Sequence, residues 1–186
     1  MWATCNVGAN TPEEYGDYFA WGETITKDYY VDRTYKHFVR TGSNNFKLTK
    51  YCCNIAYGSF GYIDSLMVLQ SEDDAATTNW GIGWCMPTID QWSELHQTVL
   101  GTWTSQNGVE GLLFTANNGN SLFLPAAGYW GEKYQGGWGW YWSSSLNAKD
   151  SRRAGCLTIN AGDCRETSVW RVYGHSVRPV RSVSNK

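Results

Sequence analysis

Residues 121–146 limit what this chain can fold into more than any other part of the sequence. They open with a strand-like run at 122–124 and close with Trp-Tyr-Trp at 140–142, and the residues between are rich in Trp, Tyr and Gly. Trp and Tyr join a large apolar face to a polar tip, and glycine allows the tight turns that packing such rings requires. We therefore expect half of these rings to pack inward and half to line a recognition surface.

The aromatic balance extends to the whole chain, which has 11 Trp and 12 Tyr but 6 Phe among 186 residues. This balance favours surfaces that combine apolar contact with hydrogen bonding. The length fits one domain, 1–186, with a substantial core. The net charge of −2 gives no reason to expect nucleic acid as a partner. No apolar run is long enough for a membrane-spanning segment.

The C-terminal quarter is basic although the whole chain is slightly acidic. Residues 142–181 contain seven Lys or Arg and three Asp or Glu. This local excess fits either a surface that faces a partner or ordinary solvated charge, and the sequence leaves both readings open.

Six cysteines occur, and their spacing matches no zinc-binding pattern. The adjacent pair Cys52-Cys53 cannot easily reach one common partner. Two alternatives remain open for the thiols. One is a disulfide from Cys5 to either member of the pair in an exported protein, and the other is a set of buried free thiols.

Capping residues mark three helix starts. Residues 11–14, Thr-Pro-Glu-Glu, predict a short helix with a capping box. Ser71 caps a second predicted helix that stops before Trp80. Thr88 and Gln91 form a capping box for the third helix, which we expect to end at Gly101. The apolar stripe of this third helix consists of Ile89, Trp92, Leu95 and Val99.

The remaining segments read as strands and loops. Residues 28–54 are polar and Tyr-rich without a clear period, which predicts a long ordered loop of the kind that often carries binding sites. The Asn-Gly pair within 117–120 predicts a hairpin between strands at 112–115 and 121–124. Further strands are expected at 2–7, 18–21, 140–144, 154–159, 168–172 and 176–180. Helices first and antiparallel strands later predict an α+β fold.

Several segments, in one order, resemble a single known family. They are WATCNVGA at 2–9, EEYGDYFAWGE at 13–23, DDAA and NWG within 73–81, MPT at 86–88, NGNSLFLPAAGY at 118–129, YWSSSL at 141–146 and SVRPVR at 176–181. The family is the Fibrobacter succinogenes major paralogous domain, a group of bacterial surface proteins. It is similar in fold to C-type lectins and to the formylglycine-generating enzyme family. The resemblance covers nearly the whole chain.

The resemblance implies a C-type-lectin-like fold with a terminal strand pair, two main helices, twisted antiparallel sheets and long ordered loops. It implies a place outside the cell, on a bacterial cell surface or on a phage particle, and no signal or anchor segment is recognised in these residues. The chain departs from the family at three points. The strand that usually precedes WATCNVGA is missing, which leaves the first strand pairing open, and Cys85 and Trp130 stand where Arg is usual.

A narrower resemblance is to proteins diversified by retroelements, including phage tropism determinants, which vary residues near the C-terminus of a fixed lectin-like scaffold. YWSSSL and SVRPVR bracket a stretch of mixed chemistry here. We therefore expect a variable face over about residues 129–175 that binds a protein or other macromolecule. Tyr, Trp and Arg suit such a face. The candidate contacts are Trp130, Tyr134, Trp138, Trp140, Lys149, Arg152, Arg153, Cys156, Arg165, Trp170, Tyr173 and His175.

A glycan is the alternative ligand, stacked on the aromatic rings without calcium. The triplets Glu-Pro-Asn, Gln-Pro-Asp and Trp-Asn-Asp of calcium-dependent lectins do not occur in the sequence, and helix capping explains Asp73 and Asp74 better than metal binding does. We expect no metal and no cofactor. A flat face with dispersed Arg favours the macromolecular ligand, whereas a concave cleft with parallel rings favours the sugar.

An enzyme of the formylglycine-generating type is the least favoured alternative. Those relatives use a pair of C-terminal cysteines, and Cys156 and Cys164 would have to supply it, with Arg153 and Arg165 lowering their pKa values. The residues around these cysteines do not resemble the active site of that family. We therefore expect a binding protein without catalytic activity.

Overall fold

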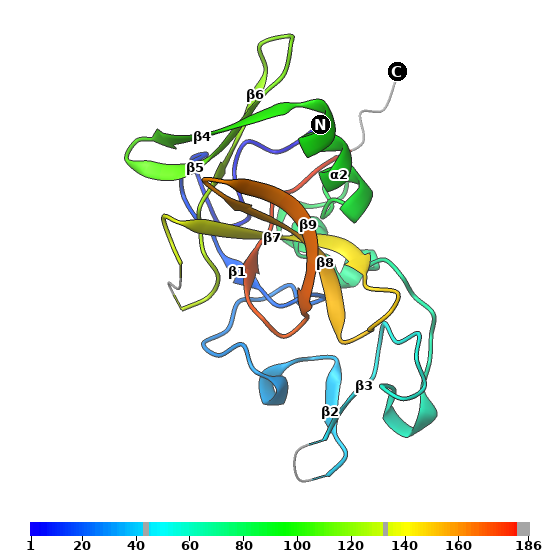
Figure 1. Ribbon diagram of the computed structural model, residues 1–186. Coiled ribbons are helices and arrows are strands. Elements are labelled where there is room, and N and C mark those ends of the chain that lie inside the picture. Colours follow the sequence, from blue (N-terminus) through cyan, green and yellow to red (C-terminus); the bar gives the residue numbers. More distant parts are fainter. Residues whose placement is uncertain (43–44, 132–133, 182–186) are drawn as a thin grey trace.

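Figure 1 shows the computed structural model of the protein, which describes residues 1–42, 45–131 and 134–181. Over these residues it has two α-helices, α1 (Ala75–Trp80) and α2 (Ile89–Thr98). The strands are β1 (Tyr18–Phe19), β2 (Phe38–Arg40), β3 (Phe46–Leu48), β4 (Leu100–Gln106), β5 (Val109–Thr115), β6 (Ser121–Pro125), β7 (Trp138–Leu146), β8 (Arg153–Asn160), β9 (Asp163–Trp170) and β10 (His175–Ser176). The short 3-10 helices are η1 (Asp32–Thr34), η2 (Ser59–Gly61) and η3 (Ser71–Asp73). This mixture confirms the predicted α+β class.

The strands form three sheets within the described residues. The largest has the order β1-β10-β7-β8-β9, in which β7, β8 and β9 run antiparallel to one another and β10 returns parallel to β7. A second sheet has the order β4-β5-β6, and β2 and β3 form a separate hairpin. Figure 1 shows the β4-β5-β6 sheet and α2 at one end of the molecule and the β2-β3 hairpin at the other.

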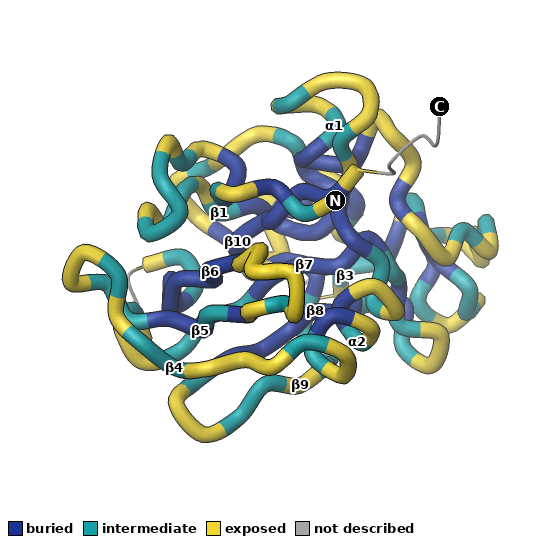
Figure 2. The backbone as a smooth tube through the Cα atoms, turned by 90° about the horizontal axis from the view of Figure 1, so that it is seen from above, coloured by how far each residue is buried: buried dark blue, intermediate teal, exposed yellow. Residues whose placement is uncertain are grey.

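The largest sheet lies between two hydrophobic clusters. The cross-strand partners Trp142 and Cys156 pack into one cluster, whereas the neighbouring partners Tyr141 and Leu157 pack into the other. Because successive residues of a strand point to opposite faces, both faces of β7 and β8 are covered. Figure 2 shows these strands as the buried centre of the molecule, with β4 largely exposed. Trp142 is fully buried, which confirms its assignment to the core.

A helix start is predicted correctly where the capping residues are unambiguous in the sequence. The predicted capping box of α2 is confirmed, with Thr88 accepting from the Gln91 amide at 3.2 Å and Gln91 accepting from the Thr88 amide at 2.9 Å. The second helix exists, but Asp74 caps it instead of Ser71, because the Asp74 carboxylate accepts from the amides of Thr77 and Met86. The helix ends at Trp80, as α1.

The predicted helix at 11–14 is wrong. The chain makes one turn there, with a bond from the Glu14 amide to the Thr11 carbonyl. It then reverses at Gly16, which has a φ of +70°. A Cβ on Gly16 would lie 2.4 Å from the Val7 carbonyl oxygen, so this close approach requires glycine and leaves no room for further helical turns.

The strand predictions are correct for the hairpin of β5 and β6 and for the positions of β7 and β8. The expected loop at 28–54 contains η1 and the β2-β3 hairpin, and β4 was not predicted. The strand expected at 168–172 begins earlier, as β9. Of the strand expected at 176–180, only Ser176 is in a strand, as the second residue of β10. In the strand expected at 2–7, Trp2 forms an isolated antiparallel bridge with Val180.

All six cysteines are free thiols, so neither candidate disulfide of Cys5 is formed. Within the described residues, no helix has the length and apolar character needed to cross a membrane.

Candidate ligand-binding face

A pocket of about 430 Å³, which we call the aromatic pocket, lies where β7, β9 and β10 meet two loops. Its lining consists of Tyr30, Val31, Tyr129, Trp130, Gly131, Trp140, Val169, Tyr173, Gly174 and His175. Six of the predicted contact residues lie close together, because β7 and β10 are neighbouring strands and the 129–131 segment folds back beside them. Four of them line the pocket, and Tyr134 and Trp138 belong to the same ring cluster.

Several rings of the cluster are nearly parallel. Trp138 and Trp140 stack with ring centroids 5.6 Å apart and planes 19° apart, and Trp140 and His175 stack at 6.2 Å and 18°. Tyr129 and Tyr173 stack at 6.5 Å and 27°. Offset stacking of this kind is a favourable arrangement for aromatic pairs. The pocket therefore has flat aromatic walls made of stacked pairs, and the two pairs stand nearly perpendicular to each other, with Tyr129 at 86° to Trp140 and at 87° to His175.

Trp130 and Tyr134 extend the ring cluster. The Trp130 ring lies 5.4 Å from that of Tyr30 and 6.1 Å from that of Tyr29, and its amide donates to the Gly174 carbonyl. Tyr134 is 60% exposed and lies 5.9 Å from the Trp140 ring. Trp130 thus forms part of the pocket wall, while Tyr134 is available at the surface.

His175 is not the exposed contact that the sequence predicted. It is 2% exposed, and its ring lies 4.5 Å from that of Trp142. Burial lowers the pKa of His175 to about 3, so the imidazole is neutral at physiological pH. His175 lies on β10, opposite Phe19 of β1, and its ring forms the inner side of the pocket.

A second group of predicted residues forms a cationic platform, by which we mean Tyr57, Asp150, Arg152, Arg153 and Trp170. The Arg152 guanidinium lies 4.1 Å from the Tyr57 ring and 5.0 Å from the Trp170 ring, and it makes two 2.9 Å bonds to the Asp150 carboxylate. These bonds lower the pKa of Asp150. Arg153 pairs with Trp170 across the β8-β9 ladder. The platform presents an Arg held in a fixed orientation by a forked ion pair.

The aromatic pocket and the cationic platform rest on one hydrophobic cluster. Trp130 of the pocket and Trp170 of the platform both pack against the buried cluster of Ala20, Tyr30, Tyr35 and Val172. The two groups are therefore joined through shared packing.

Lys149 and Arg165 lie outside both groups. Lys149 is exposed in the turn between β7 and β8. Arg165 is exposed and bonds to Asp163 at 2.9 Å. Ladder register pairs Trp140 with Thr158 and Thr158 with Arg165, so Arg165 shares a sheet face with Trp140, two strands away.

Cys156 cannot serve as a surface contact, and its prediction is wrong. It is fully buried as the cross-strand partner of Trp142. Burial raises the pKa of its thiol well above the ordinary range. Cys164 pairs with Ile159, an odd number of residues from Cys156, so the two thiols point to opposite faces of the sheet.

Iodoacetamide applied to the native protein is expected to modify Cys85 and to leave Cys156 untouched. Alkylation requires an accessible thiolate, and Cys85 is exposed whereas Cys156 has no exposed surface. Peptide mass spectrometry after a short pulse measures both sites in one sample. Equal rates at the two cysteines would contradict the burial of Cys156, and labelling in urea provides the positive control.

Sequence reasoning missed the contribution of the first half of the chain. Tyr30 lines the pocket, Tyr29 packs on Trp130, and Tyr57 stacks on Arg152. The Tyr-rich composition of residues 28–54 was the available signal for the first two. Tyr129 was also omitted from the candidate contacts, although its ring touches four others of the cluster.

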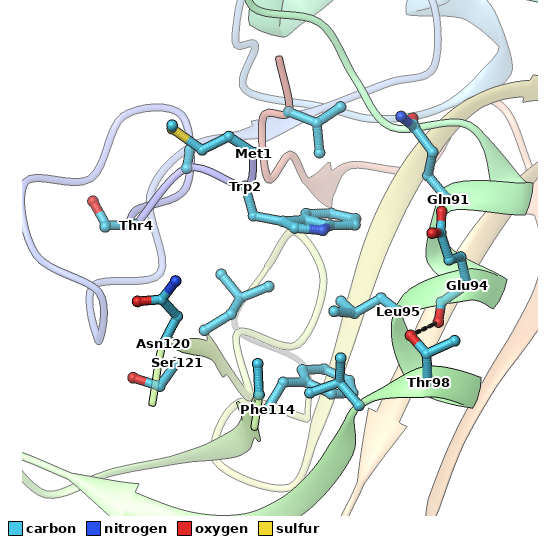
Figure 3. Close-up of a pocket in the computed structure, with 15 residues that line it drawn as sticks. Met1, Trp2, Thr4, Gln91, Glu94, Leu95, Thr98, Phe114, Asn120 and Ser121 are labelled. Carbon is cyan, nitrogen blue, oxygen red and sulfur yellow. Dashed lines mark hydrogen bonds between the residues drawn. The ribbon is translucent and has the colours of Figure 1, made fainter. Parts of the chain in front are cut away.

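A larger pocket of about 700 Å³ lies at the opposite end, between the N-terminal segment, α2 and the β5-β6 hairpin. Figure 3 shows Trp2, Leu95 and Phe114 directed toward its interior, while Glu94 and Thr98 lie along α2, joined by a hydrogen bond of 2.6 Å. None of the predicted contact residues lines this pocket.

No three His, Cys, Asp or Glu side chains gather into a metal-binding group in the part of the chain that the structure describes. Comparisons with family models, with curated proteins and with solved structures find no match for this chain.

Proposed function

We propose that this protein is a ligand-binding and display module on a C-type-lectin-like scaffold, of the kind diversified by retroelements in bacteria and phages. It recognises a protein or other macromolecular ligand outside the cell or on a phage particle, through the surface formed by about residues 129–175. The observation that supports this most is the joining of the aromatic pocket and the cationic platform through one buried cluster. Aromatic residues and Arg are the side chains that dominate binding surfaces.

The lectin-like scaffold is proposed from the sequence motifs together with the topology. The bridge between Trp2 and Val180 is consistent with a terminal strand pair, and the two α-helices and antiparallel sheets are consistent with the rest. A binding role is preferred to catalysis because Cys156 and Cys164 lie on opposite sheet faces, where they cannot act as a pair.

Randomising the exposed contact positions tests the proposal directly. A displayed library varied at Tyr134, Lys149, Arg152, Arg165 and Tyr173 is expected to retain folding in most clones and to yield binders against an unrelated protein such as streptavidin. Surface positions away from buried features change stability by about 0.5 kcal/mol or less.

A control library with the same number of clones, varied at the exposed β4 positions Leu100, Thr102 and Ser105, is expected to fold and to yield fewer binders. Loss of folding in most clones of the first library would refute the display proposal, as would equal yields from the two libraries. Finding a reverse-transcriptase gene beside an adenine-substituted copy of the coding stretch for residues 146–175 would establish natural diversification.

A glycan bound without calcium is the second candidate ligand. The concave shape of the aromatic pocket and its two stacked ring pairs favour it. A glycan array probed with the purified protein, with and without EDTA, separates this candidate from a protein ligand.

A further inference from the structure

The chemistry of the aromatic pocket restricts the charge of its ligand. Its described lining consists of Tyr and Trp rings, Val31, Val169, two glycines and His175, and none of these carries a charge at neutral pH. An ionised group placed among them would lose its hydration without gaining an ion partner, which is unfavourable. The pocket therefore suits a neutral group.

The arrangement of the walls restricts the shape of the ligand. Tyr129 and Tyr173 are stacked within 27° of parallel and Trp140 and His175 within 18°, and the first pair stands nearly perpendicular to the second. A flat ring with an apolar face can lie against such a surface and bury it. The volume of about 430 Å³ falls in the range of small-molecule sites, so it has room for one ring with its substituents.

Polar groups at the pocket remain unpaired. The hydroxyls of Tyr129 and Tyr173 and the indole N–H of Trp130 form no hydrogen bond with another described residue, and neither ring nitrogen of the buried His175 has a partner of ordinary geometry there. A ligand with several hydroxyls can engage more of these groups than a single phenol or indole side chain can. Among these groups the two His175 nitrogens are buried, and buried polar groups gain most from acquiring such partners.

We propose that the aromatic pocket binds one neutral pyranose ring, as the terminal or branching unit of a glycan, without calcium. The proposal rests on the proposed binding function and names the chemical unit that one part of the face takes. The pyranose stacks its apolar C–H face on the aromatic walls and directs its hydroxyls to the tyrosine hydroxyls and the Trp130 N–H.

Titration with simple methyl glycosides tests the proposal. The probes are the methyl pyranosides of glucose, galactose, mannose and N-acetylglucosamine, with methyl glucuronide as the charged counterpart and p-cresol as the analogue of a tyrosine side chain. NMR chemical-shift titration of the indole N–H signals reports binding. At least one neutral pyranoside is expected to saturate, with the glucuronide roughly tenfold weaker or worse and with no effect of EDTA.

Two results would overturn the proposal. The first is the absence of saturation by every neutral pyranoside. The second is tighter binding of p-cresol than of all pyranosides, which would make the pocket a receptor for an aromatic side chain of a protein partner.

Hydroxyl deletions locate the site. Tyr173→Phe and Tyr129→Phe keep the rings, and each is expected to weaken the pyranoside roughly fivefold, as the loss of one hydrogen bond does. Tyr29→Phe is the matched control, because Tyr29 packs on Trp130 without lining the pocket, and its binding is expected to be unchanged. Val169→Phe, which fills the pocket, is expected to abolish binding. Unchanged affinity in all three pocket variants would refute the site.

The same variants separate this proposal from the proposed function. A macromolecular ligand that binds the parent protein but not Arg152→Ala, together with the absence of binding by every neutral pyranoside, would support the binding face and refute the pyranose site. If no ligand binds in the library and array experiments, the proposed binding function itself is refuted.

Discussion

Replacing Arg171 with methionine is expected to lower the free energy of unfolding by at least about 3 kcal/mol. Arg171 is fully buried, and its guanidinium donates to the carbonyl oxygens of Lys50, Tyr51 and Ser151 and to the Tyr35 hydroxyl at 2.8 to 3.2 Å. Methionine fills similar space without a donor, so these acceptors would lose their partners. Urea unfolding followed by tryptophan fluorescence measures the change.

Arg165→Met is the matched control for this experiment. Arg165 is exposed, and within the described residues its ion-pair partner is Asp163. Replacing Arg165 is therefore expected to change the free energy of unfolding by about 0.5 kcal/mol or less. If the free energy of unfolding of Arg171→Met falls by less than about 1 kcal/mol, the buried acceptors find other partners. The substitution is also expected to disturb the candidate binding face, because Arg171 joins the segment around Tyr51 to Ser151, which is next to Arg152.

Arg178→Lys is expected to lower the melting temperature by about 6–12 °C, which corresponds to a loss of about 3 kcal/mol in a domain of this size. Arg178 is fully buried and donates to the Asn6 side chain at 2.8 Å, to the Ala3 carbonyl at 3.2 Å, to the Phe123 carbonyl at 3.0 Å and to the Thr4 carbonyl. Lysine keeps the charge, but its ammonium cannot reach acceptors spread around a planar fork.

Differential scanning calorimetry of Arg178→Lys, with Arg181→Lys as the control, measures this effect. Arg181 lies over the Trp84 ring at 4.9 Å on the exposed side of the same segment. We expect the control to melt within about 2 °C of the parent protein, as surface substitutions do. Equal melting temperatures for the two variants would contradict the role assigned to the buried fork.

Local signals in the sequence were sufficient to predict α2 and the β5-β6 hairpin. The capping box at Thr88 and the Asn-Gly turn at 118–119 act over a few residues, so each can be read without knowledge of the rest of the fold. Strand β4 carries no comparable signal, because most of its residues are exposed or half-buried and show no alternation. The β2-β3 hairpin is too short to show a period.

The residue types of the candidate binding face could be predicted from the sequence, but the positions of its side chains could not. Trp130, Trp140 and Tyr173 were identified as candidate contacts, yet Tyr30 of the same pocket lies about 100 residues away in the chain and reaches it only through tertiary packing. The burial of Cys156 and His175 depends on tertiary packing, because Cys156 belongs to a cluster that extends from Val7 to Val177 and the His175 ring lies 4.5 Å from that of Trp142.

The two ends of the described chain are hydrogen-bonded to each other. The Met1 amino group donates to the Arg181 carbonyl at 2.8 Å, and Trp2 is bridged to Val180. Residues 1 and 181 therefore lie side by side, and a force that separates them acts first on the bond between Met1 and Arg181 and then on the bridge between Trp2 and Val180.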